Sequence, residues 1–397
     1  MPIPTEFQFE RNVQRRFPRR LRRVCRSVLG FDPRPKDAIV QAFGEMYYDA
    51  DPLAEAFVAD AFDGLHSREG WAMLDQAIEQ GVASVPDAPA SLHALFADIE
   101  TPPSWFQPDR VERGAKAFRR WGTDVFFFAG AITLEAYHEN SVAKPLALSG
   151  SYADNGTRKR FLETARFWVD VSEPNGLSAG QPGLKAALRV RIMHVFIRSR
   201  LVKHPEWDLD AWGVPISQAD AMLTLLGGSL VPGVGLHALG YLTSKRDIED
   251  LLHFWRYVGH LMGVRPKWYP NTVTEACQAL FVGLVRGVGR AGDDEQRLVH
   301  SYINGFDGWD GRQARGFTRL FMPPWSYKRN GLPSARRATL QVLSKAPAVL
   351  ALELARRVIP GLDALADRNQ RRARSAWLHG HLKGKPAKYR PNERFTR

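Results

Sequence analysis

One histidine of this sequence lies in the middle of an apolar helical stripe, where an imidazole could do chemistry. The spacing of the surrounding residues predicts a helix near 183–203. The face that carries His194 also holds four apolar residues: Ala187, Val190, Ile197 and Leu201. A buried imidazole must have its nitrogens satisfied, either by a hydrogen bond or by a metal. The pattern leaves both readings open, and a core histidine bonded to a carbonyl is the commoner case.

Two arginines flank this histidine. Arg191 and Arg198 lie about one turn on either side of His194, at the edge of the apolar stripe. Their long side chains could extend to solvent, or their guanidinium groups could pair with the acidic groups of a bound cofactor.

A second predicted helix, near 155–171, brings a guanidinium and a hydroxyl together. Arg160 and Thr164 lie one turn apart, on a face beside the apolar stripe of this helix. On pattern alone this is an ordinary amphipathic helix. The pair becomes a candidate for catalysis only if another signal supports it.

These residues must be positioned by helices, because helical periodicity dominates the chain and no convincing run of alternating strand residues occurs. Ser217, with Asp220 three residues later, is typical of a helix start. No internal repeat and no shift in composition marks a domain boundary. The sequence therefore predicts an all-α fold with a single large helical domain over residues 36–366. We expect helices near 36–60, 68–82, 108–140, 155–171, 183–203, 217–230, 245–262, 272–290, 294–306 and 338–366.

The formal charge of +13 belongs to the two ends of the chain. Residues 1–26 carry eight arginines against two glutamates, and residues 368–397 carry ten basic side chains against one glutamate. We expect a basic N-terminal arm over 1–35 and a basic C-terminal tail over 367–397, either solvated or weakly attracted to anionic membrane lipids. No helix-turn-helix, zinc-finger or RNA-binding signature accompanies the charge, which argues against a specific nucleic-acid partner.

The number of cysteines and the position of the apolar runs argue against disulfide-rich, zinc-binding, exported and membrane-spanning proteins. The two cysteines, Cys25 and Cys277, are too few for a disulfide framework or a thiolate zinc site. The arginine-rich start has no apolar segment behind it of the kind a signal peptide has. The uncharged stretch 221–244 contains five glycines and a proline, which favours a buried, broken helix over a membrane span. We expect a cytoplasmic location, peripheral to the membrane if there is any membrane contact.

Four motifs in order along the chain resemble the latex-clearing proteins and the related oxygenase of mycophenolic acid biosynthesis. The resemblance covers roughly residues 100–300. Its motifs are Arg160-x-x-x-Thr164, Leu188-Arg-Val-Arg-Ile-Met-His194, Trp207-Asp-x-x-Ala-Trp-Gly-Val-Pro-Ile-Ser-Gln218 and Phe254-Trp-Arg-Tyr-Val-Gly-His-Leu-Met-Gly263.

The resemblance implies a helical fold with a globin-related core that binds haem b without a covalent link. His194 would then be the axial ligand of the iron, and its only metal ligand from this chain. Arg191 and Arg198 would be placed to pair with the haem propionates. Such an axial ligand sets the electronic properties of the iron.

The resemblance also implies an activity, the cleavage of a carbon–carbon double bond in an isoprenoid chain by dioxygen to give carbonyl products. Arg160 and Thr164 would lie on the distal or propionate side and position or polarise the bound oxygen. Thr224 matches a threonine of the helix after the Trp-Gly-Val-Pro motif and is included as a cofactor-binding residue.

Two departures from the family pattern change what is expected. Where the best-known rubber oxygenases have a lysine before the threonine of the Arg-x-x-x-Thr motif, a lysine able to close the sixth position of the iron, this chain has Glu163. Glu163 could act as a distal acid or base, or it could face solvent. The expected absence of an export signal argues against solid rubber, so the expected substrate is a smaller isoprenoid or unsaturated lipid.

Three hypotheses follow. The first is a haem-dependent dioxygenase with an apolar substrate. The second is a haem-binding sensor or carrier without oxygenase activity. The third is a helical scaffold at the membrane surface, without haem, in which His194 is a core residue. The sequence does not define an oligomeric state.

Overall fold

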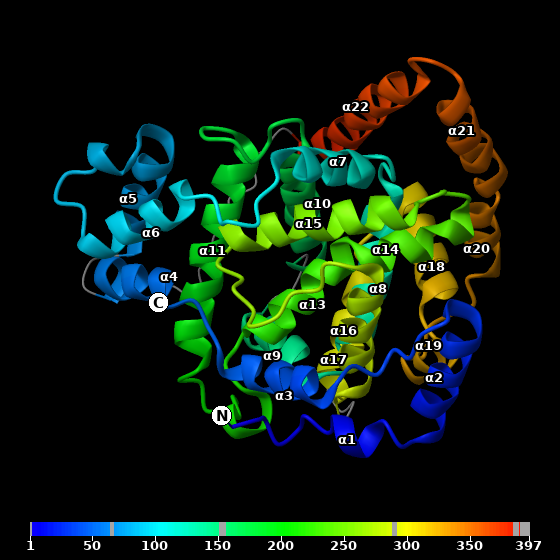
Figure 1. The fold of residues 1–397 in the computed structure, drawn as a ribbon, viewed down its shortest axis with the longest axis horizontal. Coiled ribbons are helices and arrows are strands. Elements are labelled where there is room, and N and C mark those ends of the chain that lie inside the picture. Colours follow the sequence, from blue (N-terminus) through cyan, green and yellow to red (C-terminus); the bar gives the residue numbers. More distant parts are fainter. Residues whose placement is uncertain (1, 64–66, 151–155, 288–291, 384–388, 390–397) are drawn as a thin grey trace.

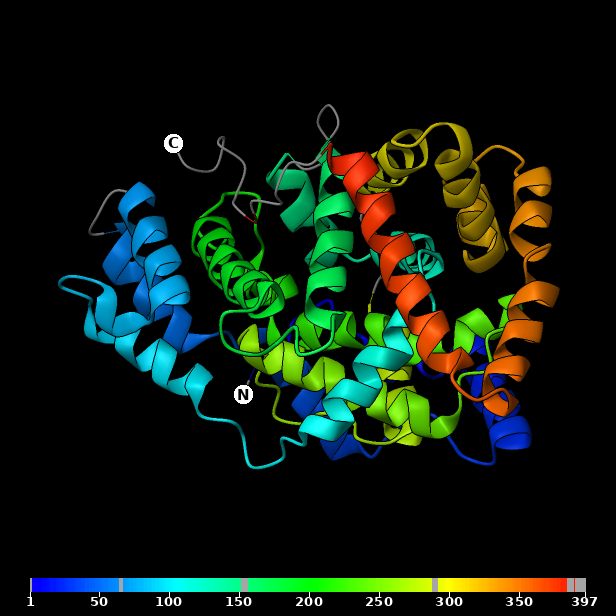
Figure 2. The same cartoon turned by 90° about the horizontal axis from the view of Figure 1, so that it is seen from above.

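Helices make up all the regular secondary structure in the part of the chain that the structure describes. This computed structural model describes residues 2–63, 67–150, 156–287, 292–383 and 389. Figures 1 and 2 show one packed helical body, with residues 52–100 at one end and residues 336–358 at the other. The prediction of an all-α fold is confirmed.

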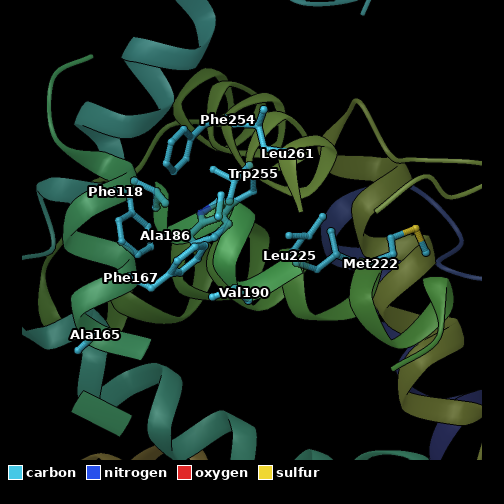
Figure 3. Packing of buried hydrophobic residues seen from close by; sticks show 14 of the residues in the cluster. Phe118, Ala165, Phe167, Ala186, Val190, Met222, Leu225, Phe254, Trp255 and Leu261 are labelled. Atoms are coloured by element: carbon cyan, nitrogen blue, oxygen red, sulfur yellow. The ribbon is translucent and has the colours of Figure 1, made fainter. Parts of the chain in front are cut away.

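The centre of the body is built from six helices that bury large apolar side chains. Figure 3 shows Phe118, Phe167 and Trp255 directed into the space between these helices. The rings of Phe118 and Trp255 meet edge to face, with their centroids 5.2 Å apart. The six helices are α7 (Pro108–Arg119), α8 (Asp124–Ala136), α10 (Gly156–Ser172), α11 (Pro182–Leu201), α13 (Gln218–Gly228) and α15 (Lys245–Leu261).

Helices α10 and α11, which carry most of the predicted site residues, follow one another in the chain and pack together. In the turn between them, the Leu184 N–H donates to the Gly176 carbonyl at 3.1 Å. Gly183 lies against this turn, where a Cβ atom would sit 2.5 Å from the Gly176 oxygen and 2.6 Å from the Asp170 oxygen. The absence of a side chain at Gly183 therefore sets how closely α10 and α11 approach.

Sequence periodicity located most of the helices but joined some that are separate. The helix expected near 108–140 is divided into α7 and α8, because Gly122 takes a left-handed φ of +57° between them. The helix expected near 36–60 is α3 (Asp37–Glu45), the short η1 (Met46–Tyr48) and α4 (Pro52–Val58). Ser217 does begin α13, and its hydroxyl accepts from the Asp220 N–H. Several helices were not predicted, among them α2 (Arg16–Leu29), α6 (Ala90–Glu100), α9 (Asn140–Leu148), α18 (Gly308–Phe321) and most of α22 (Leu362–Leu382).

The N-terminal segment packs on the body, so the boundary predicted at residue 35 does not mark the start of the fold. Phe9 is buried at 1% exposure, and Val13 is fully buried. The side-chain amide of Asn12 donates to the carbonyl oxygens of Val285 and Gly287, at 2.9 and 2.7 Å. The arginines of this segment predicted a separate basic arm. Its few apolar residues instead pack into the core and so determine where the segment lies.

The boundary predicted at residue 366 is also corrected, because α22 (Leu362–Leu382) runs across it. Leu378 of this helix is buried in the core. The buried guanidinium of Arg374 donates to the Ser172 hydroxyl at 3.1 Å, at the end of α10. The segment predicted as a basic tail therefore begins as part of the packed body.

Two segments of the described chain are long and apolar enough to cross a membrane by length and composition, Gln218–Leu239 and Arg336–Val358. In the first, 56% of the most apolar stretch is buried inside the fold, in agreement with the expected buried, broken helix. In the second only 11% is buried. These two segments therefore have very different surroundings despite similar composition.

Replacing Gly183 by alanine will lower the free energy of unfolding by about 1–3 kcal/mol, because the new methyl group meets two backbone carbonyls that cannot move independently. The same replacement at Gly380, where a Cβ atom meets nothing within 4 Å, is the matched control and will raise stability by up to about 1 kcal/mol. Urea denaturation of both variants measures the difference. Equal effects at the two sites would contradict the close approach of α10 and α11.

Candidate functional site

His194 lies on α11, and its imidazole makes no hydrogen bond to any residue that the structure describes. Burial, followed by the positive charges of Arg198 and Arg160, lowers the pKa of His194 to about 4. The ring is therefore neutral at pH 7 and keeps a free nitrogen lone pair. A neutral imidazole is the form in which histidine binds a metal.

Arg160 and His194 lie on the neighbouring helices α10 and α11, close enough for the charge of Arg160 to lower the pKa of His194. Arg160 has an exposed side chain, yet burial is the main influence on its pKa, which it lowers. His194 is partly exposed, and burial is again the main influence on its pKa. Both side chains thus keep accessible surface while protein atoms surround them. The charge of Arg160 acts on His194, so the two face the same region.

Helix α10 gives this region its polar wall. Thr164 lies one turn after Arg160, and its side chain is exposed. Glu163 is half-buried, and burial raises the pKa of its carboxyl group, while the charges of Lys159 and Arg160 oppose the rise. The three predicted residues of this helix are thus adjacent, with a guanidinium, a hydroxyl and a carboxyl group that holds its proton more readily than usual.

The sequence did not single out Tyr137, which lies close to Arg160, or Tyr302, which lies close to Tyr137. The pKa of Tyr137, at the end of α8, is raised by burial, and the charge of Arg160 opposes the rise. The Tyr302 hydroxyl is buried and finds no hydrogen-bond partner in the described chain. Tyr302 also interacts with Tyr137, and burial raises its pKa. Tyr137 is adjacent in sequence to His138 and Glu139, but no spacing rule connects either tyrosine to Arg160.

Arg191 makes ion pairs within the protein, and its predicted role in cofactor binding stays a prediction. Its side chain is 1% exposed. The guanidinium donates to both oxygens of Asp51, at 2.7 and 2.9 Å, and to Asp98 at 3.3 Å. Through these carboxylates Arg191 joins α11 to the residue before α4 and to α6.

Arg198 is likewise used within the protein. Its guanidinium donates to the carbonyl oxygens of Pro215 and Ile216, at 2.9 and 2.7 Å, and to Glu55 at 3.0 Å. These contacts hold the loop before α13 against α11. Of these partners, Pro215 and Ile216 follow Arg198 by 17 and 18 residues, whereas Glu55 lies 143 residues away in the sequence.

Thr224 lies on α13 with an exposed side chain, and its hydroxyl donates to the Asp220 carbonyl one turn earlier, at 2.9 Å. This is a common way for a threonine to satisfy its hydroxyl within a helix. No hydrogen bond joins Thr224 to another predicted site residue in the described chain.

The chemistry of the donor set limits what the site can hold. Among the described residues, no group of three or more His, Cys, Asp or Glu side chains is arranged to hold a metal ion. A haem iron takes its equatorial ligands from the porphyrin and needs only an axial ligand from the protein. A neutral imidazole without a hydrogen bond in the described chain, on a helix face that also carries Val190 and Ile197, fits that requirement.

The fold and this site define an all-α protein in which a neutral histidine, His194, lies beside a helix that carries polar residues. The family described as "ER-bound oxygenase mpaB/B'/Rubber oxygenase, catalytic domain" matches residues 115–352. The chain belongs to this family, and hence to a family of oxidoreductases. The resemblance found in the sequence motifs is confirmed.

Two relatives add detail. The chain is 25% identical, over 233 residues, to the rubber oxygenase of Streptomyces sp. (strain K30), a match that covers 56% of this chain and 54% of that protein. The chain thus spans about half the length of that relative. A solved structure of latex clearing protein LCP in the closed state superposes with a TM-score of 0.60 at 19% identity, over 83% of this chain and 91% of the other. At this identity the second match establishes a shared fold.

Replacing Arg191 by methionine will lower the free energy of unfolding by about 3–5 kcal/mol, because Asp51 is left buried without its main partner. The loss will appear in urea denaturation of the protein prepared without any cofactor. The double variant Arg191→Met with Asp51→Asn will recover part of it. A stability loss seen only in the presence of a cofactor would contradict this structural role and indicate that Arg191 binds the cofactor.

Proposed function

We propose that this protein is a haem b-dependent oxygenase that uses dioxygen to cleave a carbon–carbon double bond of an apolar substrate. Its membership of an oxygenase family supports the class of reaction. The observation that carries the proposal is the state of His194, which is neutral and makes no hydrogen bond in the described chain. Such an imidazole has a nitrogen lone pair that a metal ion can use.

His194 would hold the haem iron as its axial ligand, in the globin-related core that the resemblance implies. The bound haem would supply the activation of dioxygen, which protein side chains do not perform. Packing of α11 against α10 fixes the imidazole, so the protein determines where the iron lies.

The polar residues of α10 would act on the oxygen and the substrate. Arg160 keeps a fixed positive charge, since a guanidinium stays protonated in proteins even when burial lowers its pKa. Thr164 adds a hydroxyl donor one turn away. Glu163 would hold a proton on its carboxyl oxygen at a higher pH than an exposed glutamate and so could return it during the reaction.

An apolar substrate of the isoprenoid or unsaturated-lipid class fits the walls of this region. Val190 and Ile197 lie on the same side of α11 as His194. The relative from Streptomyces is named a rubber oxygenase, and we propose a shorter olefin for this chain.

Absorption spectroscopy of the purified protein, before and after addition of haemin, tests the proposal. The wild type will give a Soret band, and His194→Ala will lose or shift that band because the iron loses its ligand. His93→Ala is the control, since His93 is exposed on α6, and it will keep the wild-type spectrum. A wild type that stays colourless after haemin is added would overturn the haem proposal.

Products of olefin cleavage then separate an enzyme from a haem sensor or carrier. Incubation with dioxygen and a short isoprenoid will give carbonyl products, and Arg160→Gln will lower the rate by about 10²–10³-fold while the haem stays bound. Arg200→Gln, an exposed arginine of α11 that lies over the Phe196 ring, is the control and will retain the rate. A haem protein whose spectrum does not respond to oxygen, and which forms no product, would identify the second class.

A further inference from the structure

Helix α21 (Ala346–Val358) turns a buried carboxylate toward the protein and several large apolar residues toward solvent. On the inner side, Glu353 is buried, and its carboxylate accepts from the Leu242 N–H at 3.0 Å. The same carboxylate pairs with Arg120 at 3.6 Å and with Arg356 at 3.3 Å. Val349 adds an apolar contact with the core, so charged groups and one apolar residue attach α21 to the body.

The outer side of α21 carries a continuous apolar stripe. Leu350, Leu354 and Val358 follow one another at four-residue spacing and are 39, 52 and 77% exposed. These three residues define the surface that we call the α21 face. In Figures 1 and 2, α20 (Arg336–Leu343) and α21 form the outer edge of one end of the molecule. A row of large exposed apolar residues at such an edge is typical of a surface that another body covers.

Charges around the α21 face indicate what covers it. The carboxylates of α20 to α22 are Glu353, Asp363 and Asp367, and each is ion-paired with a lysine or an arginine. The exposed charged residues of these helices are all cationic: Arg336, Arg337, Arg357, Arg368 and Arg372. An apolar stripe on α21, with the exposed charges of α20 to α22 all positive, complements an anionic lipid surface.

We propose that the α21 face binds the surface of an anionic lipid bilayer, with Leu350, Leu354 and Val358 inserted among the lipids and the arginines on their headgroups. The proposal concerns this surface alone and does not depend on the oxygenase function. It also differs from a contact through the charged ends of the chain, because the stripe lies on the α21 helix of the folded body.

The structure favours a helix that lies on the membrane over one that crosses it. Helix α21 has 13 residues, which extend about 20 Å, whereas the bilayer core is about 30 Å thick. Helix α20 cannot supply the missing length, because it packs on α18 and its Val342 is fully buried.

A second copy of this chain is a poorer occupant of the same surface. A symmetric pair would place the same surface of each copy against the other. The arginines beside the stripe would then meet like charges, with no exposed carboxylate on α20 to α22 to compensate.

Sedimentation with lipid vesicles tests the proposal on the full-length protein. The wild type will bind phosphatidylcholine vesicles that contain about one-third phosphatidylglycerol. Binding will weaken with added salt, and it will be much weaker to phosphatidylcholine alone. The triple variant Leu350→Gln, Leu354→Gln, Val358→Gln will bind about tenfold more weakly or worse, because the apolar insertion is lost.

A matched control uses the other exposed apolar and basic helix, α2 (Arg16–Leu29). Val24→Gln, Val28→Gln and Leu29→Gln together remove three exposed apolar residues there, and this variant will bind vesicles as the wild type does. Arg336→Gln with Arg337→Gln leaves the apolar stripe intact and will weaken binding about fivefold for each charge at low salt.

Three results would overturn the proposal. The first is a wild type that does not bind anionic vesicles. The second is a loss of binding in the α2 variant while the α21 variant still binds. The third is a lipid-free dimer, seen by analytical ultracentrifugation, that the α21 variant alone dissociates, since a second copy would then cover this surface.

Discussion

The proposed chemistry depends on the state of His194. Protein atoms surround its imidazole, which has no hydrogen-bond partner in the described chain. A neutral ring is less costly to bury than a charged one, and burial together with two nearby arginines keeps His194 neutral. The same arginine that lowers its pKa, Arg160, lies on the facing helix. The close approach of α10 and α11 thus creates both the electrostatic state of the histidine and the polar wall beside it.

The arginines of α10 and α11 differ in whether they bind carboxylates of the protein. Arg191 and Arg198 are saturated by Asp51, Asp98, Glu55 and two carbonyl oxygens, so they hold the histidine helix in place. Arg160 has no carboxylate in hydrogen-bonding contact among the described residues and lies beside an accessible space. A structural arginine and one available to a ligand are therefore distinguished by their partners, although all three occupy similar positions on their helices.

Helical periodicity and capping signals were enough to predict the all-α fold, the site helices α10 and α11, and the start of α13 at Ser217. His194, Arg160 and Thr164 could be located on particular faces because those faces follow from local spacing. The partners of Arg191 could not be predicted, since Asp51 lies 140 residues away in sequence and only the tertiary fold brings it near. Tyr302 and the buried Phe9 were missed for the same reason. Their positions depend on contacts between distant helices.

The central claim is that the His194 nitrogen holds an iron atom, and chemical rescue of a cavity variant tests it most directly. His194→Gly should lose the haem or its wild-type spectrum, and free imidazole added to this variant should restore both, because the ligand fits the space that the ring leaves. Resonance Raman spectroscopy of the reduced, rescued protein should then show an iron–imidazole stretching band that shifts when ¹⁵N-imidazole is used. Retention of the wild-type spectrum by His194→Gly without imidazole would contradict the account.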